Sequence, residues 1–439
     1  MWVPAAVVAG EDETELFTLE DSIAIAVERS LQIRSAREAL RGARATKKEA
    51  FTSFLPTFNT QYRYRRINET PTTMMFNPTA WNYREVPVGT RDNYTWSLEV
   101  AQPLFAGGAI TGAYEIAGTG VDISKLEQRT VIQDVILQVR ESYVTILKAE
   151  RVRDVADQSV ELLESHRKMT ESFYDAGVVP RNDLLYAEVE LANGIQNRMA
   201  AENALELAKA RFNTLLRRPI SAAVEVEDIL SYHPFEKNLE ECLSKALELR
   251  PELATYELQV HQAEQAIGVA KSGYYPTVSV LGNYSRYGDD PGVSGNNYVD
   301  QEDWYVMAVA DWNFWEWGKT RHGVEVSRSR LEQAKNALEN VRDMVSLEVK
   351  NAYLNMREAE KRIFVAEKAV IQAEENYRLN VERYNEQVGT TTEVIDAQTL
   401  LTRARSDYFN ALSNYHLDLG ELERSMGVLY GAEQYATNE

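Results

Sequence analysis

Two turn-like segments of the chain bring together the polar side chains best suited to form a functional site. The first reads YDAGVVPRNDLLYAEVEL (174–191) and the second YNEQVGTTTEVIDAQTLL (384–401). In each segment a tyrosine precedes the turn, and a carboxylate follows nine residues later at the start of the next predicted helix. The carboxylates are Asp183 and Glu393, and the tyrosine of the second segment is Tyr384. Phenols and carboxylates at such a place can link helices through hydrogen bonds or attract cations.

A capping role would explain part of this pattern without any further function. Asp183 is a candidate N-cap, and Thr390 with Glu393 fits a capping box, in which each side chain satisfies a free backbone N–H group. Asp396 is different, because it lies one turn inside the helix, on the face of Glu393, where no backbone N–H group needs a cap. The sequence leaves both interpretations of Asp183 and Glu393 open.

The other residues that carry chemistry predict no enzyme, cofactor or metal site. No Walker A, dinucleotide-binding or G-x-S-x-G motif occurs, and Gly107-Gly108 is interpreted as a turn between a strand and a helix. Cys242, the only cysteine, excludes an internal disulfide and a cysteine-based zinc site, and its spacing to Ala246 is that of a buried helical position. The five histidines are scattered without paired spacing: His166, His233, His261, His322 and His416.

Composition narrows the class of protein further. The 439 residues are 44% hydrophobic and 10% aromatic, too apolar for a disordered chain, and the net charge of -20 argues against binding to nucleic acid. No run reaches the roughly 18–20 consecutive apolar residues of a membrane-spanning helix, which leaves a membrane β-barrel open. The start, MWVPAAVVAGEDE, is similar to the end of a signal peptide. Residues 1–17 are therefore expected to be a leader remnant or an ordinary N-terminal extension.

The chain contains an internal duplication. At an offset of 220 residues, Pro56-Thr57 aligns with Pro276-Thr277 without a gap, and the matches before the prolines keep this offset. Beyond the strands the offset becomes 210. Matches in order and at a fixed offset indicate two copies of one design. Pairs at the second offset include Tyr143 with Tyr353, Glu150 with Glu360, Tyr174 with Tyr384 and Leu191 with Leu401.

The predicted organisation follows from this duplication. The first repeat spans 18–217 and the second 238–427, with a linker at 218–237 and a C-terminal tail at 428–439. Each repeat is expected to hold a helix of about 35 residues, two strands, a helical run of about 65 residues, a turn and a second helix of about 35 residues. The strands are predicted at about 57–67, 94–102, 277–287 and 303–313, and the turns at 175–182 and 385–392.

The predicted helices are too long for a globular core. The opening helices, 19–54 and 239–274, are expected to stop before Pro56 and Pro276, because proline disfavours helix at the preceding residue. These two prolines thus mark the junctions between helix and strand. A run of about 65 residues would extend roughly 100 Å at a rise of about 1.5 Å per residue. Such lengths indicate a bundle, a coiled coil or a tube.

Alternation within the four strands is compatible with a membrane-spanning sheet. Each strand has about 9–11 residues, enough to cross a bilayer when tilted, with apolar and aromatic side chains on one face and polar side chains on the other. A half-buried sheet in a soluble protein has the same period, so the strands alone leave both possibilities open. The apolar sets are Phe58, Thr60, Tyr62, Tyr64; Tyr94, Trp96, Leu98, Val100; Val278, Val280, Tyr284; and Trp304, Val306, Ala308, Ala310.

The number of strands favours an assembly over a single subunit. Four strands cannot close a barrel, for which about eight are needed, and an open sheet would leave unpaired backbone groups in hydrocarbon. If the strands cross a membrane, several subunits must share one barrel. The long helices would then continue its wall as a second tube.

With these features assembled, the chain resembles the TolC-like outer membrane efflux protein family over residues 17–427. The resemblance is carried by LEDSIAIAVERSLQIRSAREALRGARATKKEAFTSFLPT, by its second copy ending in SGYYPT, by PLFAGG after the second strand, and by the turn motifs YDAGVVPRNDLL and YNEQVGTTTEVIDA. Each motif alone is weak. Their order, the duplication and the lengths together are specific.

The resemblance implies an α+β membrane protein that assembles as a homotrimer. Each subunit would contribute four strands to one twelve-stranded transmembrane β-barrel in the bacterial outer membrane, and its helices to a long α-helical barrel in the periplasm. The helix turns would form a periplasmic tip that is closed at rest and engages a periplasmic adaptor (membrane fusion) protein. The adaptor would link the tip to an inner-membrane pump of the resistance-nodulation-division, major-facilitator or ABC type.

The resemblance also assigns roles at the tip. Tyr384, Glu393 and Asp396 match the tyrosine and the two acidic positions of the second turn, and Asp183 matches the acidic partner of the first turn. These four residues are expected to form the periplasmic gate, with polar contacts of Tyr384 and Asp183 holding it shut.

The second turn departs from the family pattern in two ways. Gln387 stands at the usual position of the glycine, and Gly389 follows two residues later. The arginine often found in this turn is also absent. The detailed links of the closed state therefore do not carry over to this chain.

The expected function is a passive export duct of a tripartite efflux pump, which conducts small molecules from the periplasm or the pump to the outside. An alternative with the same fold is the outer membrane component of a type I protein secretion system, and nothing in the chain separates the two. A soluble coiled-coil scaffold with a small β head is a distant alternative. The Trp and Tyr residues of the strands and the leader-like start argue against it.

Overall fold

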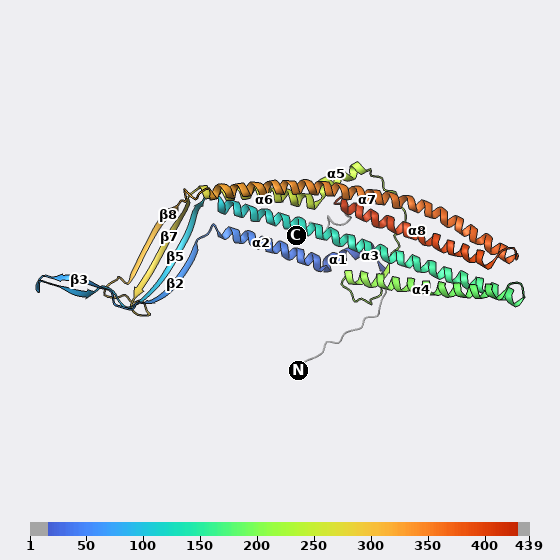
Figure 1. Ribbon diagram of the computed structural model, residues 1–439, viewed down its shortest axis with the longest axis horizontal. Helices are drawn as coiled ribbons and strands as arrows, with labels where there is room; N and C mark the ends of the chain where they lie inside the picture. The colour runs from blue at the N-terminus through green and yellow to red at the C-terminus, as the bar shows by residue number, and fades with distance from the viewer. Residues whose placement is uncertain (1–15, 429–439) are drawn as a thin grey trace, which may run out of the picture. The chain divides into compact units, whose positions relative to one another are not determined.

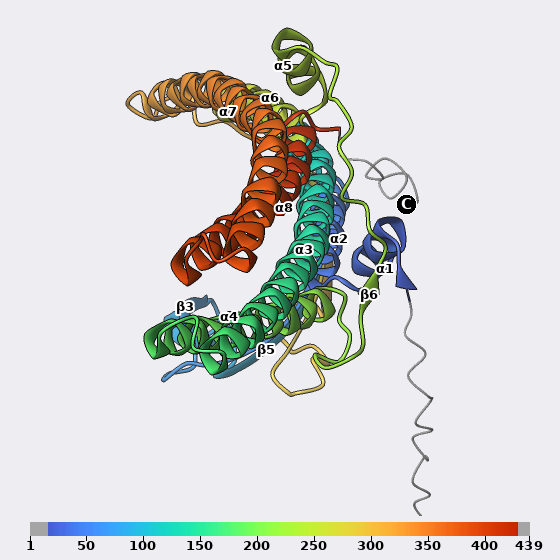
Figure 2. The same cartoon turned by 90° about the vertical axis from the view of Figure 1, so that its right-hand side faces the viewer.

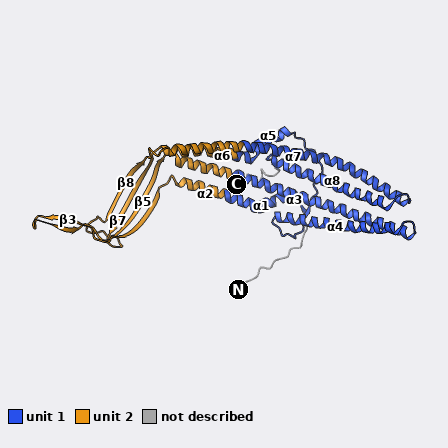
Figure 3. Ribbon diagram, viewed as in Figure 1, with its two compact units in different colours: residues 1–39, 125–255, 339–439 blue, residues 40–124, 256–338 orange. Residues whose placement is uncertain are grey.

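The computed structural model describes residues 16–428, so the first fifteen residues and most of the predicted tail lie outside the described part of the chain. The chain divides into two compact units, shown in different colours in Figure 3. The four-stranded sheet belongs to the second unit, and the helix hairpins belong to the first. Within the described residues, the first unit comprises 16–39, 125–255 and 339–428, and the second comprises Leu40–Ser124 and Tyr256–Leu338.

Each repeat contributes four α-helices, two of them short and two long (Figure 1). The two longest, α3 and α7, have 67 residues each, and the helices that follow them have 35 each. The first repeat contains α1 (Leu19–Arg29), α2 (Leu31–Thr52), α3 (Ala109–Asp175) and α4 (Arg181–Leu215). The second contains α5 (Leu239–Leu249), α6 (Pro251–Lys271), a 3-10 turn (Ser272–Tyr274), α7 (Lys319–Asn385) and α8 (Thr391–Ser425).

The opening helix of each repeat is broken once, which corrects the expectation of continuous helices over 19–54 and 239–274. Ser30 separates α1 from α2 with a ψ of 129°, and Arg250 separates α5 from α6 with a ψ of 119°. Proline explains the second break, because Pro251 disfavours helix at Arg250 and is itself well suited to the first turn of α6. In the first repeat the Ser30 hydroxyl accepts a hydrogen bond from the Ile33 backbone N–H group, as an N-cap does.

The second unit contains an antiparallel sheet with the strand order β2–β5–β7–β8. Pro56 lies immediately before β2 and Pro276 immediately before β7. The two outer strands, β2 and β8, have no neighbour on their outer sides within the described chain. The strands are β2 (Thr57–Arg66), β5 (Asp92–Ala106), β7 (Thr277–Gly288) and β8 (Glu302–Asp311).

The register of this sheet places the four alternating apolar sets on the same face. One row across the sheet is formed by Phe58, Val100, Gly282 and Val306, and the next row on that face by Thr60, Leu98, Tyr284 and Trp304. The intervening row, Asn59, Glu99, Asn283 and Tyr305, lies on the opposite face because successive side chains of a strand alternate. The sheet therefore has one apolar and one largely polar face.

A second, two-stranded sheet occupies the segment that the sequence predicts to be a loop between the first two strands. Its strands are β3 (Thr72–Asn77) and β4 (Asn82–Pro87), which form an antiparallel hairpin. Phe76 lies opposite Tyr83, with ring centroids 5.5 Å apart, and Trp81 packs edge-on against Phe76 at 5.5 Å. The Asn, Pro and Thr residues here suggest turns, and the pairing of these aromatic rings across the hairpin is not visible in the sequence.

The helices of the first unit pack through several apolar clusters. In one cluster Ile23, Val27 and Ile33 meet an apolar stripe of α3, which is buried at Val135 and Val139. A second cluster joins α5, α7 and α8 around Met356 and Tyr415, and it includes the fully buried Cys242. The stripe of α3 is thus a packing surface, as its period predicts.

The linker between the repeats takes part in the fold of the first unit. Its strand β6 (Glu225–Val226) pairs in parallel with β1 (Leu16–Phe17), and Phe17 is buried against Phe212. The hydroxyl of the buried Tyr143 lies 2.9 Å from the carbonyl oxygen of Phe17 and 2.8 Å from that of Glu227. Residues 16 and 17 therefore belong to the folded part of the chain and not to the extension predicted over 1–17.

No helix within residues 16–428 is long and apolar enough to cross a membrane.

Candidate functional site

The four predicted gate residues lie at the ends of two helix hairpins of the first unit, α3–α4 and α7–α8. Figure 2 looks toward these ends, and each hairpin appears there as a pair of adjacent helices. Tyr384 is in the last turn of α7 and is only 2% exposed. Glu393 and Asp396 are in the first two turns of α8, and Asp183 is in the first turn of α4. Of the four, only Tyr384 is buried.

A chain of hydrogen bonds connects Tyr384 to α3 and to α8. The Thr391 hydroxyl donates to the Tyr384 hydroxyl over 3.1 Å, and the Tyr384 hydroxyl donates to the Thr170 hydroxyl, also over 3.1 Å. The Thr170 hydroxyl donates in turn to the backbone carbonyl of His166, one helical turn earlier, over 2.9 Å. All four residues are at least 95% buried, which strengthens these bonds electrostatically and makes an unpaired member costly. The result is a direct link between the two hairpins.

Aromatic contacts surround the same hydroxyl chain. The Tyr384 ring lies 5.0 Å from the imidazole of His166 and 5.4 Å from the ring of Phe173, centroid to centroid. The Nε2 atom of His166 is buried and has no hydrogen-bond partner among the described residues. Burial alone lowers the pKa of this imidazole from 6.5 to about 4, so the ring is neutral at pH 7.

Asp183 is not part of this link. Among residues 16–428 its carboxylate makes no hydrogen bond or ion pair, and the Tyr384 hydroxyl bonds to Thr170 and Thr391 instead. Nor is Asp183 an N-cap: Pro180 takes that position, without a side-chain cap, and Asp183 is the third residue of α4. A carboxylate in the first turn of a helix is favoured by the helix dipole, which accounts for its presence there.

Glu393 does perform the capping role that the sequence suggests. Its carboxylate accepts a hydrogen bond from the Thr390 backbone N–H group at 2.9 Å, and the Thr390 hydroxyl accepts one from the Glu393 N–H group at 3.2 Å. The same carboxylate lies 3.6 Å from a guanidinium nitrogen of Arg383. Capping does not exclude a further role, because the carboxylate remains partly exposed.

Asp396 is exposed and acts electrostatically on the other hairpin. Burial, followed by the negative charges of Glu190 and Asp396, raises the pKa of Tyr186 on α4. The negative charge of Asp396 on α8 therefore lies close enough to α4 to contribute to the raised pKa of Tyr186. It has no hydrogen-bond or ion-pair partner within the described part of the chain.

The two hairpin turns share one backbone conformation despite their different sequences. Gly177 ends α3 with a φ of 75°, and Gln387, at the same place in the second repeat, ends α7 with a φ of 60°. In each turn the residue after it, Val178 or Val388, donates its N–H group to a carbonyl five residues earlier. Gln387 therefore adopts the left-handed conformation in place of glycine, at a cost of about 1 kcal/mol.

Thr170, Thr391 and His166 are the partners of Tyr384, and the sequence alone does not predict them. His166 and Thr170 are four residues apart, on one face of α3, and this spacing was the only available signal. At the equivalent positions of the second repeat stand Asn376 and Asn380. The duplication does not extend to this contact, so comparison of the repeats cannot reveal it.

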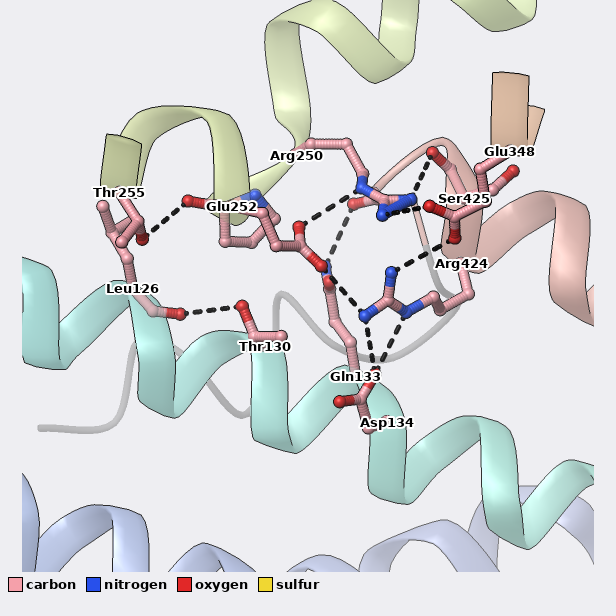
Figure 4. A network of polar contacts seen from close by, with 12 residues as sticks. Leu126, Thr130, Gln133, Asp134, Arg250, Glu252, Thr255, Glu348, Arg424 and Ser425 are labelled. Carbon is pink, nitrogen blue, oxygen red and sulfur yellow. Dashed lines mark hydrogen bonds and ion pairs between the residues drawn. The ribbon is translucent and has the colours of Figure 1, made fainter. Parts of the chain in front are cut away.

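A second polar cluster lies at the break between α5 and α6, where two arginines share three carboxylates (Figure 4). Arg250 is 5% exposed, and its guanidinium contacts Glu348 at 2.7 Å, Glu252 at 3.2 Å and the Ser425 carbonyl at 3.1 Å. Arg424 contacts Asp134 at 2.8 Å and Glu252 at 2.9 Å. The cluster joins α3, α6, α7 and α8 through ion pairs, so its role in the described chain is structural.

A groove of about 630 Å³ runs between α7 and α8, away from the hairpin end. Its floor contains the small side chains Ala366, Ala404 and Ala411, and charged residues of both signs border it. Val365 and Leu400 also line the groove and are 70% and 51% exposed. Within the described residues, no group of three or more His, Cys, Asp or Glu side chains is placed to hold a metal ion.

The fold is that of several outer membrane channels of known structure. CmeC of Campylobacter jejuni superposes with a TM-score of 0.79 at 15% identity, covering 100% of this chain and 98% of that one. VceC of Vibrio cholerae has a TM-score of 0.78 at 14% identity, over 94% and 96% of the two chains. MtrE of Neisseria gonorrhoeae, in its open state, has a TM-score of 0.74 at 19% identity, over 94% and 89%. At these identities the likeness establishes the fold alone.

The sequence itself matches a known family. None of the curated protein sequences compared with the chain matches it significantly. The family model described as outer membrane efflux protein, in contrast, matches residues 23–216 and 242–428, which is most of both repeats. The chain therefore belongs to the outer membrane efflux protein family.

Proposed function

We propose that the protein is the outer membrane duct of a tripartite efflux pump, formed by three copies of the chain and passively conducting small molecules out of the periplasm. Family membership establishes the general class of the protein, which is an outer membrane efflux channel and not an enzyme. The proposal that three copies form a duct is supported mainly by the sheet of the second unit, which has one apolar face, one polar face and two unpaired edges.

The apolar face of the sheet is the surface proposed to contact lipid. Phe58, Val306 and Trp304 on this face are 72%, 66% and 70% exposed in the single chain. Large aromatic and aliphatic side chains exposed together in this way mark a surface that is covered in the native state. The opposite face presents Arg63, Glu99 and other polar side chains, as expected for a water-filled lumen.

The two sheet edges support the proposed homotrimer. The outer sides of β2 and β8 carry unpaired backbone groups, which cannot remain unpaired in hydrocarbon. Pairing of β8 in one copy with β2 in the next would satisfy both edges. Three copies would give twelve strands, which is enough to enclose an aqueous channel. The 67-residue helices α3 and α7 would extend roughly 100 Å and form the wall of the periplasmic tunnel.

We further propose that the hairpin ends are the gate of this duct, with Tyr384, Asp183, Glu393 and Asp396 as its polar residues. The buried link from Tyr384 to Thr170 supports a role for Tyr384 in holding α7 against α3. The half-exposed carboxylate of Asp183 and the exposed carboxylate of Asp396 are suited to a different role. Around a three-fold axis each would be present three times, in a ring that attracts cations and repels itself. Opening would separate the hairpins and break the Tyr384 link.

The proposed partners are a periplasmic adaptor protein and, through it, an inner-membrane pump. The groove between α7 and α8 supports this proposal, because its alanine floor and exposed Val365 and Leu400 suit an amphipathic helix of a partner. Its charged borders, which include Glu358 and Arg403, would orient such a helix. The class of the pump, whether resistance-nodulation-division, major-facilitator or ABC, follows from the adaptor and not from this chain.

Fractionation and conductance measurements test the proposal together. We expect the full chain to appear in the outer membrane fraction as a trimer that dissociates on heating, and the purified trimer to form channels in planar bilayers. A monomer in the soluble fraction would refute the membrane duct. A trimer in the outer membrane that conducts no ions under any condition would refute passive conduction while leaving the location intact.

A further inference from the structure

The contact between α3 and α7 contains a buried histidine that neither capping nor packing requires. His166 is 5% exposed, and its Nε2 atom has no hydrogen-bond partner among residues 16–428. A buried polar atom without a partner is costly, since it loses its hydration and gains nothing in exchange. Most such atoms in proteins are paired, so an unpaired imidazole nitrogen at a contact between two helix hairpins calls for an explanation.

His166 contacts the Tyr384 link through both its side chain and its backbone carbonyl. Its imidazole packs against the Tyr384 ring at 5.0 Å, and its backbone carbonyl accepts the hydrogen bond from Thr170 that completes the hydroxyl chain. A movement of the imidazole out of its site would therefore remove a packing contact of Tyr384. Any event that expels the ring disturbs Tyr384 and hence the contact between the hairpins.

No opposite charge is available inside this contact to stabilise a protonated imidazole. Charged residues near this contact lie on all four helices: Glu164, Arg167, Lys168 and Glu171 on α3; Arg181, Asp183, Glu188 and Glu190 on α4; Glu382 and Arg383 on α7; and Glu393 and Asp396 on α8. All of them are exposed or half-exposed, and burial is the sole cause of the lowered pKa of His166. The carboxylates lie where an imidazolium could meet them only after leaving the buried site.

We infer that His166 makes the contact between the two hairpins sensitive to protons. The neutral imidazole is compatible with the closed contact of α3 and α7, and the imidazolium is not, so acidification separates the hairpin ends. The separation itself depends only on the contacts described above. Its consequence for conductance rests on the proposed role of the hairpin ends as the gate.

The direction and size of the effect follow from the two protonation equilibria. The pKa of His166 is about 4 in the closed contact and close to the ordinary value of 6.5 once the ring is exposed. The closed contact is therefore fully stable above pH 6.5, weakens as the pH falls, and reaches its lowest stability below pH 4. Between pH 7 and pH 5 the ratio of closed to open hairpins should fall roughly 20-fold.

His416 offers a matched control within the same unit. It is also a buried histidine, 9% exposed, and burial lowers its pKa as well. Its Nε2 atom, however, lies 2.9 Å from the carbonyl oxygen of Ser231, and it is far along α8 from the hairpin end. Replacing it removes a buried titrating group without touching the Tyr384 link.

Hydrogen exchange of the purified full-length protein at pH 7 and pH 5, corrected for the intrinsic rate, tests the inference. We expect protection of the segments 160–175 and 380–395 to fall about 20-fold in the wild type and in His416→Gln, and less than twofold in His166→Gln. Equal losses in wild type and His166→Gln would overturn the inference, since carboxylates would then be responsible. Unchanged protection in the wild type would overturn it as well.

A titration of His166 in the wild-type protein tests the inference without depending on correct folding of the variant. In the histidine-labelled protein, the imidazole resonance assigned to His166 by its loss in His166→Gln should titrate well below 6.5. A midpoint at or above 6.5 would contradict the inference. Single-channel recordings distinguish the proton-sensitive contact from the proposed gate. Loss of protection at pH 5 with unchanged conductance would support the proton-sensitive contact and show that the hairpin ends do not form the gate.

Discussion

The hydroxyl of Tyr384 lies 3.1 Å from the hydroxyl of Thr170, although the two residues are 214 positions apart in the chain. One belongs to the end of α7 and the other to the last turns of α3, so this bond joins the hairpins of the two repeats. The duplicated tyrosine, Tyr174, is 37% exposed and has no such bond within the described residues. The duplication thus produced two similar hairpins and one buried link between them.

Removing the hydroxyl of Tyr384 should weaken this link. Tyr384→Phe keeps the ring but leaves the buried hydroxyls of Thr170 and Thr391 without their common partner, at a cost of about 1–2 kcal/mol to the closed contact. We expect a larger mean single-channel conductance at neutral pH. Tyr174→Phe is the matched control and should leave conductance unchanged. Equal conductance in both variants would exclude Tyr384 from the gate.

The turn at Gln387 should be improved by glycine. Gln387 has a φ of 60°, where a residue with a Cβ atom is strained and glycine is not. Gln387→Gly is expected to stabilise the hairpin by about 1 kcal/mol, which differential scanning calorimetry would detect as a higher unfolding temperature. Gly177→Ala, at the equivalent φ of 75°, should lower it by a similar free energy. A lower unfolding temperature for Gln387→Gly, or a higher one for Gly177→Ala, would contradict the assigned turn geometry.

The arginine cluster at the helix break should contribute far more to stability than any surface ion pair. Arg250→Met would leave Arg424 as the single guanidinium for the carboxylates of Asp134, Glu252 and Glu348 in a largely buried site, and should cost about 3 kcal/mol of unfolding free energy.

Arg378→Met is the control for this cluster. Arg378 pairs with Glu375 at 2.7 Å on the surface of α7, with half of its side chain exposed, and its loss should change the free energy of unfolding little. Denaturant titration of both variants measures the difference. A cost for Arg250→Met no larger than that for Arg378→Met would mean that the cluster is effectively solvated.

The two faces of the sheet should respond differently to charge. Val306 lies on the apolar face, in the row of Phe58 and Val100, and Met307 is its neighbour on the opposite face. An arginine facing lipid near the middle of a bilayer costs about 2–4 kcal/mol, whereas one facing a lumen costs little. We expect Val306→Arg to reduce the yield of heat-dissociable trimer in the outer membrane and Met307→Arg to leave it unchanged. The reverse pattern would show that the faces are assigned the wrong way round.

Much of this fold could be predicted because its signals are local and repeated. The alternation in each strand fixed which side chains share a face, and the register then joined Phe58, Val100 and Val306 in one row. The helix break at Ser30 is hard to predict because one non-helical residue barely disturbs the hydrophobic period, whereas Pro251 is a local sequence signal for the break at Arg250. The hairpin β3–β4 was missed because its stability depends on pairs of side chains across strands of low intrinsic propensity.

In the candidate site, too, some features follow from the local sequence and others from the tertiary structure. The sequence by itself determined that Tyr384, Asp183, Glu393 and Asp396 lie at hairpin ends, because caps, turns and helix periods are set by neighbouring residues. It also determined the capping box of Thr390 and Glu393. Only the tertiary structure decided that Tyr384 meets Thr170 and His166 while Asp183 stays apart. The reason is physical: burial and hydrogen-bond partners depend on how helices from the two repeats pack, and residues some 200 positions apart carry no mark of that contact in their local sequence.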